Sequence, residues 1–303
     1  MAAITTPGEI ADSVILIDAV HEGLHRAHAV FLLKSSNGRS CLIDGGTKNS
    51  APVIRDKLME FSAWPPDKLI ITHSHWDHSQ GVPYLVEQAK KDGKSIEILA
   101  SDKAVPYLAD QSFNIVFGEE NAPFLNVKSV NPVREGDIVD LGGGLSLKII
   151  ETPGHMVDHI SILDERSRFI FVGDAMGMIW GGNLVVPNPN TIYFSESDFL
   201  SSVEKVKTSG FKALCLTHFG YLMDGEGMDF LDQIVAMYER WIDVLSQHED
   251  RIDDFDFLTS TILVKAYDHL PEKFIKLIFE PLKDAVKLAA VSYKSRRMSF
   301  TEI

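Results

Sequence analysis

The sequence Thr72-His73-Ser74-His75-Trp76-Asp77-His78-Ser79 places three imidazoles and one carboxylate within six positions, from His73 to His78. It follows an apolar run at residues 69–71 that is typical of a buried strand. Imidazole and carboxylate are ligands that divalent metals such as zinc and iron accept. If the segment leaves the strand extended, His73, His75 and Asp77 point to one side and His78 faces elsewhere. One tetrahedral ion cannot use all four side chains, so the segment predicts two adjacent metal ions. The alternative is a polar surface loop that happens to be rich in histidine.

Other strand-like stretches also end at a candidate ligand. Residues 145–150 lead to His155, residues 168–173 lead to Asp174, and residues 213–217 lead to His218. In open α/β sheets, sites lie beyond the carboxyl ends of strands, so we expect these side chains to converge. The predicted ligands are His73, His75 and His155 for one ion, and Asp77, His78 and His218 for the other, with Asp174 as a bridge. Each ion would keep room for a shared water, as a catalytic site requires.

With these motifs the chain resembles the metallo-β-lactamase superfamily, whose hallmark is His-x-His-x-Asp-His. The later landmarks follow in the family's order: Thr-Pro-Gly-His ending at His155, Gly-Asp at Asp174, and a histidine after the last sheet strand at His218. Leu42-Ile43-Asp44-Gly45-Gly46 matches an early strand-and-turn signature. The resemblance spans about residues 10–222. It implies an α/β fold, a four-layer αββα sandwich with a dinuclear site at one edge, in which Asp44 orients the metal loop.

Within the superfamily, the run Thr217-His218-Phe219-Gly220-Tyr221 and the helical tail resemble those of an uncharacterised branch. That branch is related to lactonases, to hydroxyacylglutathione-hydrolase-like thioesterases and to quinolone-signal response proteins. Those thioesterases usually carry Gly just before the second histidine of the Thr-Pro-Gly-His run, where this chain has Asp158 before His159. The flavo-diiron branch has Glu at the second histidine of the motif, where this chain has His75.

The resemblance implies a metal-dependent hydrolase with two divalent ions, zinc first, and iron or manganese as alternatives. A metal-activated hydroxide would attack a small-molecule ester, thioester, lactone or phosphoester. Asp77 is the expected catalytic residue, because its second oxygen can orient the nucleophile. Two other classes remain open. One is an iron-dependent oxidoreductase on the same fold, and the other is a metabolite-binding regulatory protein with an idle metal site.

Composition restricts the partners. The chain has 303 residues, a formal net charge of −14 and 45% hydrophobic residues, so it can bury a large core. The negative charge argues against nonspecific binding of nucleic acid or of anionic membranes. We see no signal peptide and no apolar stretch of membrane-spanning length, and therefore expect a cytoplasmic protein. The two cysteines, Cys41 and Cys215, lie in apolar runs and do not indicate a disulfide framework.

The chain divides into a metallo-β-lactamase-fold domain, residues 1–224, and a helical C-terminal extension, residues 225–303, packed on the same domain. Apolar side chains recur at helical spacing over residues 228–248, and two further helices are expected at 258–270 and 271–293. The extension could cover one face of the sandwich, act as a lid, or form a homodimer contact. Residues 102–128 look irregular apart from a helix near 104–110.

Several other histidines and aromatic residues are not among the predicted ligands. His21, His25 and His28 form a local cluster outside the family's ligand positions, so we expect them not to bind metal. His159 is expected to be a structural, hydrogen-bonding histidine. Aromatic residues near the ligands, among them Trp76, Tyr193 and Tyr221, could line an apolar substrate pocket or simply pack in the core.

Overall fold

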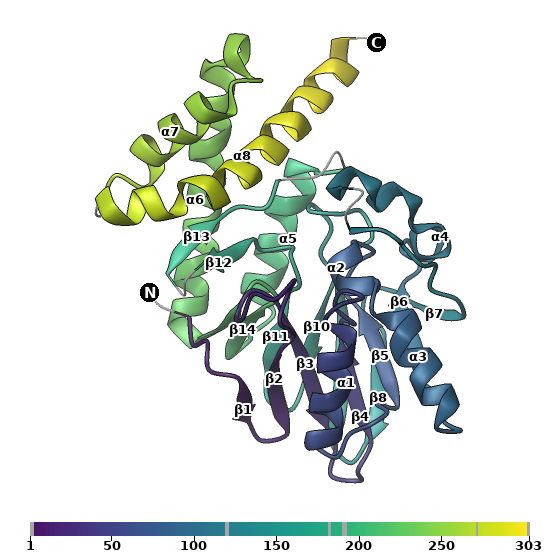
Figure 1. The fold of residues 1–303 in the computed structure, drawn as a ribbon. Helices are drawn as coiled ribbons and strands as arrows, with labels where there is room; N and C mark the ends of the chain where they lie inside the picture. Colours follow the sequence, from purple (N-terminus) through teal and green to yellow (C-terminus); the bar gives the residue numbers. More distant parts are fainter. Residues whose placement is uncertain (1–2, 119–120, 181–182, 190–192, 271, 302–303) are drawn as a thin grey trace.

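Two β-sheets packed face to face form the centre of the computed structural model, and helices cover both outer faces (Figure 1). This is the predicted αββα sandwich with C-terminal helices. The structure describes residues 3–118, 121–180, 183–189, 193–270 and 272–301.

The first sheet has seven strands in the order β1-β2-β3-β4-β5-β6-β7. Their bounds are β1 Gly8–Ala11, β2 Val14–Asp18, β3 Ala29–Lys34, β4 Ser40–Ile43, β5 Lys68–Ile71, β6 Glu97–Ser101 and β7 Val130–Val133. Strands β1 to β4 pair antiparallel, whereas β4 to β7 pair parallel. The parallel half therefore delivers the segments after β4 and β5 to one edge of the sheet.

The second sheet has six strands in the order β15-β14-β11-β10-β9-β8. Their bounds are β8 Ile138–Gly142, β9 Leu145–Glu151, β10 Ile160–Asp164, β11 Phe169–Phe171, β14 Ala213–Leu216 and β15 Gly220–Met223. Strands β11 and β14 pair parallel, and they end immediately before the Asp174 and His218 segments. A separate hairpin, β12 Met178–Trp180 and β13 Leu184–Val186, follows Asp174.

Strand β2 illustrates why the layers form. Val14 and Leu16 belong to the apolar cluster between the two sheets, whereas Ile15 and Ile17 belong to the cluster between the first sheet and its helices. Successive side chains in a strand point to opposite faces, so a strand that is apolar throughout has both faces covered. The alternation explains the continuous apolar run in the sequence.

The helices lie where these apolar faces need cover. Helices α1 (Ala51–Glu60), α3 (Val82–Lys91) and α4 (Val105–Ala109) contribute buried side chains to the outer cluster of the first sheet. Helix α5 (Glu196–Thr208) and the first half of α6 (Asp224–Gln247) cover the second sheet. The remaining helical elements are α2 (Trp76–Ser79), the 3₁₀ helices η1 (Gln111–Phe117) and η3 (Glu249–Arg251), α7 (Phe255–Ala266) and α8 (Glu272–Thr301).

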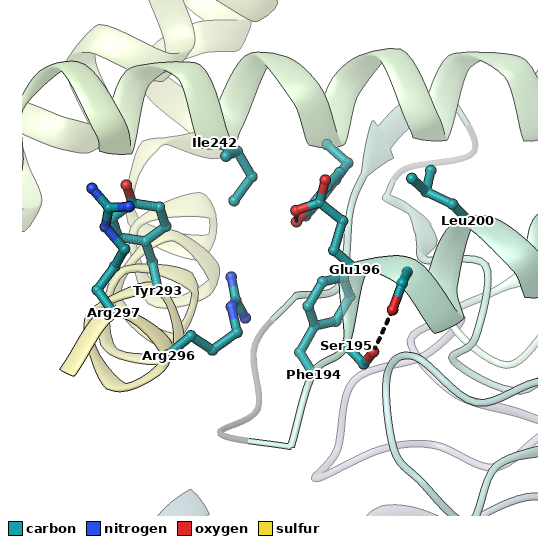
Figure 2. Close-up of a pocket in the computed structure, with 10 residues that line it drawn as sticks. Phe194, Ser195, Glu196, Leu200, Ile242, Tyr293, Arg296 and Arg297 are labelled. Atoms are coloured by element: carbon teal, nitrogen blue, oxygen red, sulfur yellow. Dashed lines mark hydrogen bonds between the residues drawn. The ribbon is translucent and has the colours of Figure 1, made fainter. Parts of the chain in front are cut away.

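The C-terminal helices contact the body at several places. Trp241 of α6 is fully buried in a cluster that joins α7 and α8 to the β12–β13 hairpin, and the Tyr267 hydroxyl donates to the Val185 carbonyl at 2.8 Å. Farther along α8, the Arg296 guanidinium lies 5.1 Å from the Phe194 ring beside a cavity of about 750 Å³ (Figure 2). These contacts favour an extension packed on the same domain, but the division after residue 224 stays a prediction.

Several elements of the structure have no counterpart among the predicted ones. Strands β1, β7 and β15, the β12–β13 hairpin and the short helix α2 were not expected. Pro271, where the last helix was expected to begin, lies outside the described residues. Among the helices of the described residues, none is both long enough and apolar enough to cross a membrane.

Candidate metal centre

Four predicted ligands from three strand ends form a first group. The His75 Nδ1 atom lies 2.9 Å from His73 Nε2 and 3.0 Å from His155 Nε2. An oxygen of Asp174, Oδ2, lies 3.6 Å from His155 Nε2. One ligand atom from each of the four residues lies within 4.8 Å of the others, and all four side chains are buried. This spacing is that of donors around a single ion.

The other predicted ligands form a second group beside the first. His218 Nε2 lies 3.4 Å from Asp77 Oδ2 and 3.4 Å from Asp174 Oδ1. His78 Nε2 lies 3.7 Å from Asp77 Oδ2 and 3.3 Å from Asp174 Oδ1. The two oxygens of Asp174 therefore face different groups, which is the position predicted for a bridging carboxylate. All seven predicted residues come together at one edge of the sandwich.

The path of the metal loop differs from the expectation. Strand β5 ends at Ile71, residues 72–74 form bends, and His75 directly precedes the helical turn α2. Asp77 and His78 lie within that turn, so the period-two argument fails for Asp77. A helical turn brings two consecutive side chains, those of Asp77 and His78, to the second group. An extended chain would point them to opposite sides.

The outward-facing nitrogens of several imidazoles are held by protein acceptors. The Nδ1 atom of His78 lies 2.8 Å from Asp44 Oδ2, that of His155 lies 3.0 Å from the Asn188 carbonyl, and that of His218 lies 3.0 Å from the Ala27 carbonyl. If each Nδ1 donates, each Nε2 presents a lone pair to the centre. Such partners fix the tautomer and the ring orientation of metal-binding histidines.

Asn188 has a second contact at the centre. Its Nδ2 donates to Asp174 Oδ2 at 3.0 Å, so one residue steadies both a histidine and the central carboxylate. Asn188 was not predicted as a site residue, and it follows the unexpected β12–β13 hairpin. Its neighbours Pro187 and Pro189 mark a loop but carry no chemical signal.

The electrostatics of the two groups differ. Burial and neighbouring imidazoles hold the pKa of His73 and of His75 well below the ordinary value. Burial also opposes protonation of His218, but the carboxylates of Asp174 and Asp77 raise its pKa to about 10. Burial raises the pKa of Asp77, yet His78 and His218 outweigh it and lower that pKa overall. The carboxylates of the second group thus favour positive charge on His218, whereas the imidazoles of the first group are neutral donors.

The donor set fits a pair of divalent ions. His78 Nε2 and Asp174 Oδ1 are buried and lie 3.3 Å apart, but neither makes a hydrogen bond within the described residues. A buried polar atom without a partner costs about 1–3 kcal/mol, more if it is charged. Cations between the two groups would satisfy these atoms, and imidazole with carboxylate is a suitable ligand set for zinc, iron or manganese.

The histidines outside the predicted set fall in different places. His25 is exposed and its Nδ1 lies 3.0 Å from Asp18 Oδ2. His159 contacts Thr152 Oγ1 through Nδ1 at 3.0 Å and accepts from the Asp174 backbone N–H through Nε2 at 3.2 Å. His28, which was expected not to bind metal, lies instead in the second group with Asp77, His78 and His218. Cys41 and Cys215 are buried free thiols, and burial raises the pKa of Cys41 to about 12.

An aromatic wall lies beside the first group. The Phe117 ring centroid is 4.8 Å from that of His75, and the Phe113 centroid is 6.5 Å from it. Tyr107 and Tyr193 extend the wall, with centroids 5.3 Å and 6.4 Å from that of Phe113. We use the term aromatic wall for these four residues.

Comparisons with known proteins agree with the fold and the motifs. The family model described as Metallo-beta-lactamase superfamily matches residues 24–218. The hydroxyacylglutathione hydrolase of Methylobacterium nodulans is 28% identical over 145 residues, which cover 48% of each chain. The chain thus spans about half the length of the curated relatives it matches.

Two solved structures share the architecture. The metallo-beta-lactamase family protein TTHA1429 from Thermus thermophilus has a TM-score of 0.61 at 16% identity, over 95% of both chains. TTHA1623, solved in a di-iron-bound form, has a TM-score of 0.51 at 18% identity, over 65% of this chain and 89% of that one. The family match covers well over half of the chain, and the fold agrees with it. This chain belongs to the metallo-β-lactamase superfamily.

Proposed function

We propose that this chain is a dinuclear, metal-dependent hydrolase of a small-molecule ester, thioester, lactone or phosphoester. The observation that supports it most is the position of Asp174, whose Oδ1 faces His78 and His218 and whose Oδ2 faces His155. A carboxylate with its two oxygens directed at two donor groups suits a pair of neighbouring ions. When bound, such ions make a water more acidic near neutral pH and stabilise negative charge that develops on the substrate.

The protein side chains would then have distinct roles. His73, His75 and His155 would hold one ion, while Asp77, His78 and His218 would hold the other. Asp77 directs Oδ2 at His218 Nε2. Its Oδ1 would accept a hydrogen bond from the attacking water and so orient a lone pair toward the substrate. Five of the seven proposed donors are buried, and Asp77 and His218 are partly buried, which limits competition from bulk water for these contacts.

The aromatic wall suggests the character of the substrate. Phe113 and Phe117 lie against His75, one of the proposed ligands, so a substrate at the centre would contact their rings. Aromatic surfaces favour an apolar acyl or ring portion next to the scissile bond. The curated relatives named hydroxyacylglutathione hydrolase keep thioesters among the candidates.

The substitution Asp77→Ala tests this function. Protein reconstituted with zinc should bind about two ions per chain and hydrolyse at least one member of a panel of esters, thioesters, lactones and phosphoesters. In the variant, metal content should fall toward one ion and kcat should fall about 1,000-fold, because several kcal/mol of nucleophile activation are lost. Asp268→Ala, at an exposed residue before α8, is the matched control. Wild-type turnover by the Asp77→Ala variant would contradict the dinuclear hydrolase.

An iron-dependent oxidoreductase is the second candidate, and the di-iron-bound TTHA1623 structure is the observation that favours it. Elemental analysis and the visible spectrum of the purified protein distinguish the two. Iron at two ions per chain, oxygen consumption with a reductant and no hydrolysis across the panel would favour the oxidoreductase.

A further inference from the structure

His28 is a buried imidazole without an ordinary structural role. Only 1% of the residue is exposed, and neither ring nitrogen has a hydrogen-bond partner among the described residues. In either neutral tautomer one nitrogen carries an N–H, so the ring leaves at least one polar group unsatisfied. That arrangement costs about 1–3 kcal/mol, which an aliphatic or aromatic residue at this position would avoid.

The neighbours of His28 are metal-ligand candidates. Its Nε2 lies 4.0 Å from Asp77 Oδ2, and its ring centroid lies 5.2 Å from those of His78 and His218. Its ligand atom is within 4.8 Å of those of Asp77, His78 and His218. Two donors bound to one ion at about 2.1 Å are ~3.4 Å apart at the tetrahedral angle and ~4.2 Å apart when opposite. The 4.0 Å separation between His28 Nε2 and Asp77 Oδ2 therefore fits a wide ligand–metal–ligand angle in a five-coordinate site.

The backbone holds His28 in this position. The Ala19 N–H donates to the His28 carbonyl at 2.9 Å, and the Ala29 N–H donates to the Thr217 carbonyl at 2.8 Å. On the other side, the Ala27 carbonyl contacts His218 Nδ1 at 3.0 Å. The connection between β2 and β3 thus presents His28 and braces His218 at the same time, so the two rings have a fixed relation.

His21 closes the outer side of His28. Their rings stack with centroids 5.8 Å apart and an interplanar angle of 17°, and the His21 ring is 5.5 Å from that of Trp76. Because His21 covers one face of the His28 ring, the edge of that ring points toward the second group.

We propose that His28 is a further protein ligand of the second ion, through Nε2, in addition to Asp77, His78, His218 and Asp174. The inference rests on the proposed dinuclear function. A His28 ligand would make the two ions unequal. The second ion would be held by three imidazoles and two carboxylates, whereas the first would be held by three imidazoles and one carboxylate. The second ion should therefore be the more tightly held and have the higher coordination number.

Metal titration tests this role without relying on turnover. Zn²⁺ is titrated, against a chromophoric chelator, into three metal-free proteins: wild type, His28→Phe and His28→Gln. The second site of each protein is also examined with Co²⁺. In both variants the first ion should bind as in wild type and the second at least about 10-fold more weakly. The visible Co²⁺ absorption should intensify, because the coordination number falls. His25→Gln, which alters the exposed neighbour, should match wild type.

Wild-type protein provides an independent measurement. The ¹⁵N resonance of His28 Nε2 should shift on Zn²⁺ addition as the resonances of the other ligands do, a result that needs no folded variant. An unchanged His28 resonance, or two ions bound by His28→Phe and His28→Gln with wild-type affinity and spectrum, would overturn this role alone. Fewer than two ions in wild type would instead overturn the dinuclear function.

Discussion

Asp44 influences the centre without being among its proposed ligands. Its backbone is in the left-handed region, at φ 65°, which an Asp tolerates better than most residues. From there Oδ1 accepts from the Thr72 N–H at 2.8 Å and Oδ2 faces His78 Nδ1 at 2.8 Å. Asp44 therefore holds the start of the metal loop and also fixes the tautomer of His78, a proposed ligand. The family resemblance predicted only that Asp44 orients the metal loop.

Asp44→Asn should weaken binding of the second ion about 10- to 100-fold while the fold survives. An Asn oxygen can still accept from Thr72, but its amide would then present a donor to His78 Nδ1. His78 would have to keep its proton on Nε2, which removes the lone pair that would bind the ion. Zn²⁺ titration and the melting temperature of the metal-free protein check this expectation. Asp140→Asn, at an exposed strand residue, is the control, and equal Zn²⁺ affinity in the two variants would contradict it.

The sequence could predict those residues whose chemistry is local. His73 to His78 stand together, and His155, Asp174 and His218 each follow a strand-like run. His28 could not be predicted this way, because it reaches the centre only through long-range pairing of Ala29 with Thr217. Gly173 shows a second limit. Its φ is +48°, and a Cβ there would lie 2.6 Å from His159 Nε2, a constraint that no local pattern reveals.

At the scale of elements, strong periodic runs were predictable and short irregular ones were not. The helical spacing over residues 228–248 falls almost entirely within α6, whereas the 102–128 stretch contains the unexpected 3₁₀ helix η1. This element supports the metal loop. The Asn114 Oδ1 atom accepts from the Trp76 N–H at 3.1 Å, and Asn114 Nδ2 donates to the Ser74 carbonyl at 3.2 Å. Such contacts depend on tertiary packing, so propensity and periodicity cannot indicate them.

Asn114→Ala should destabilise the protein by about 2 kcal/mol or more. The substitution leaves the N–H of Trp76 without its acceptor, which costs about 1–3 kcal/mol, and removes one of the two donors to the Ser74 carbonyl, the other being Ser79 Oγ. Binding of both ions should weaken as well, since the loop between His73 and Asp77 loses its support. Urea unfolding and Zn²⁺ titration measure the two effects. Asn131→Ala on β7 removes an exposed side-chain hydrogen bond and should change stability by less than about 0.5 kcal/mol. Similar losses in both variants would contradict the supporting role of η1.

At the scale of the whole molecule, the apolar clusters join the proposed extension to the body. Phe230 and Ile234 of α6 lie in the cluster with Leu214 and Leu216 of the second sheet. Farther along the helix, Trp241 lies in the cluster with Leu184 of the hairpin. One helix thus contributes to two clusters, and the hairpin it covers leads to Asn188 at the centre. A lid or a homodimer contact remains a prediction, whereas a covering role has these contacts in its favour.

The metal-free protein should therefore unfold in a single transition, with a ratio of calorimetric to van't Hoff enthalpy of about one. Trp241→Ala should lower the midpoint of that whole transition, because removing a fully buried Trp side chain costs about 3–5 kcal/mol. Val264→Ala, at an α7 side chain that is 69% exposed, should shift it little, since substitutions at such sites stay within about 0.5 kcal/mol. Differential scanning calorimetry of the three proteins decides the matter. Two resolved transitions, of which Trp241→Ala moves only one, would mean that residues 225–303 unfold as an independent domain.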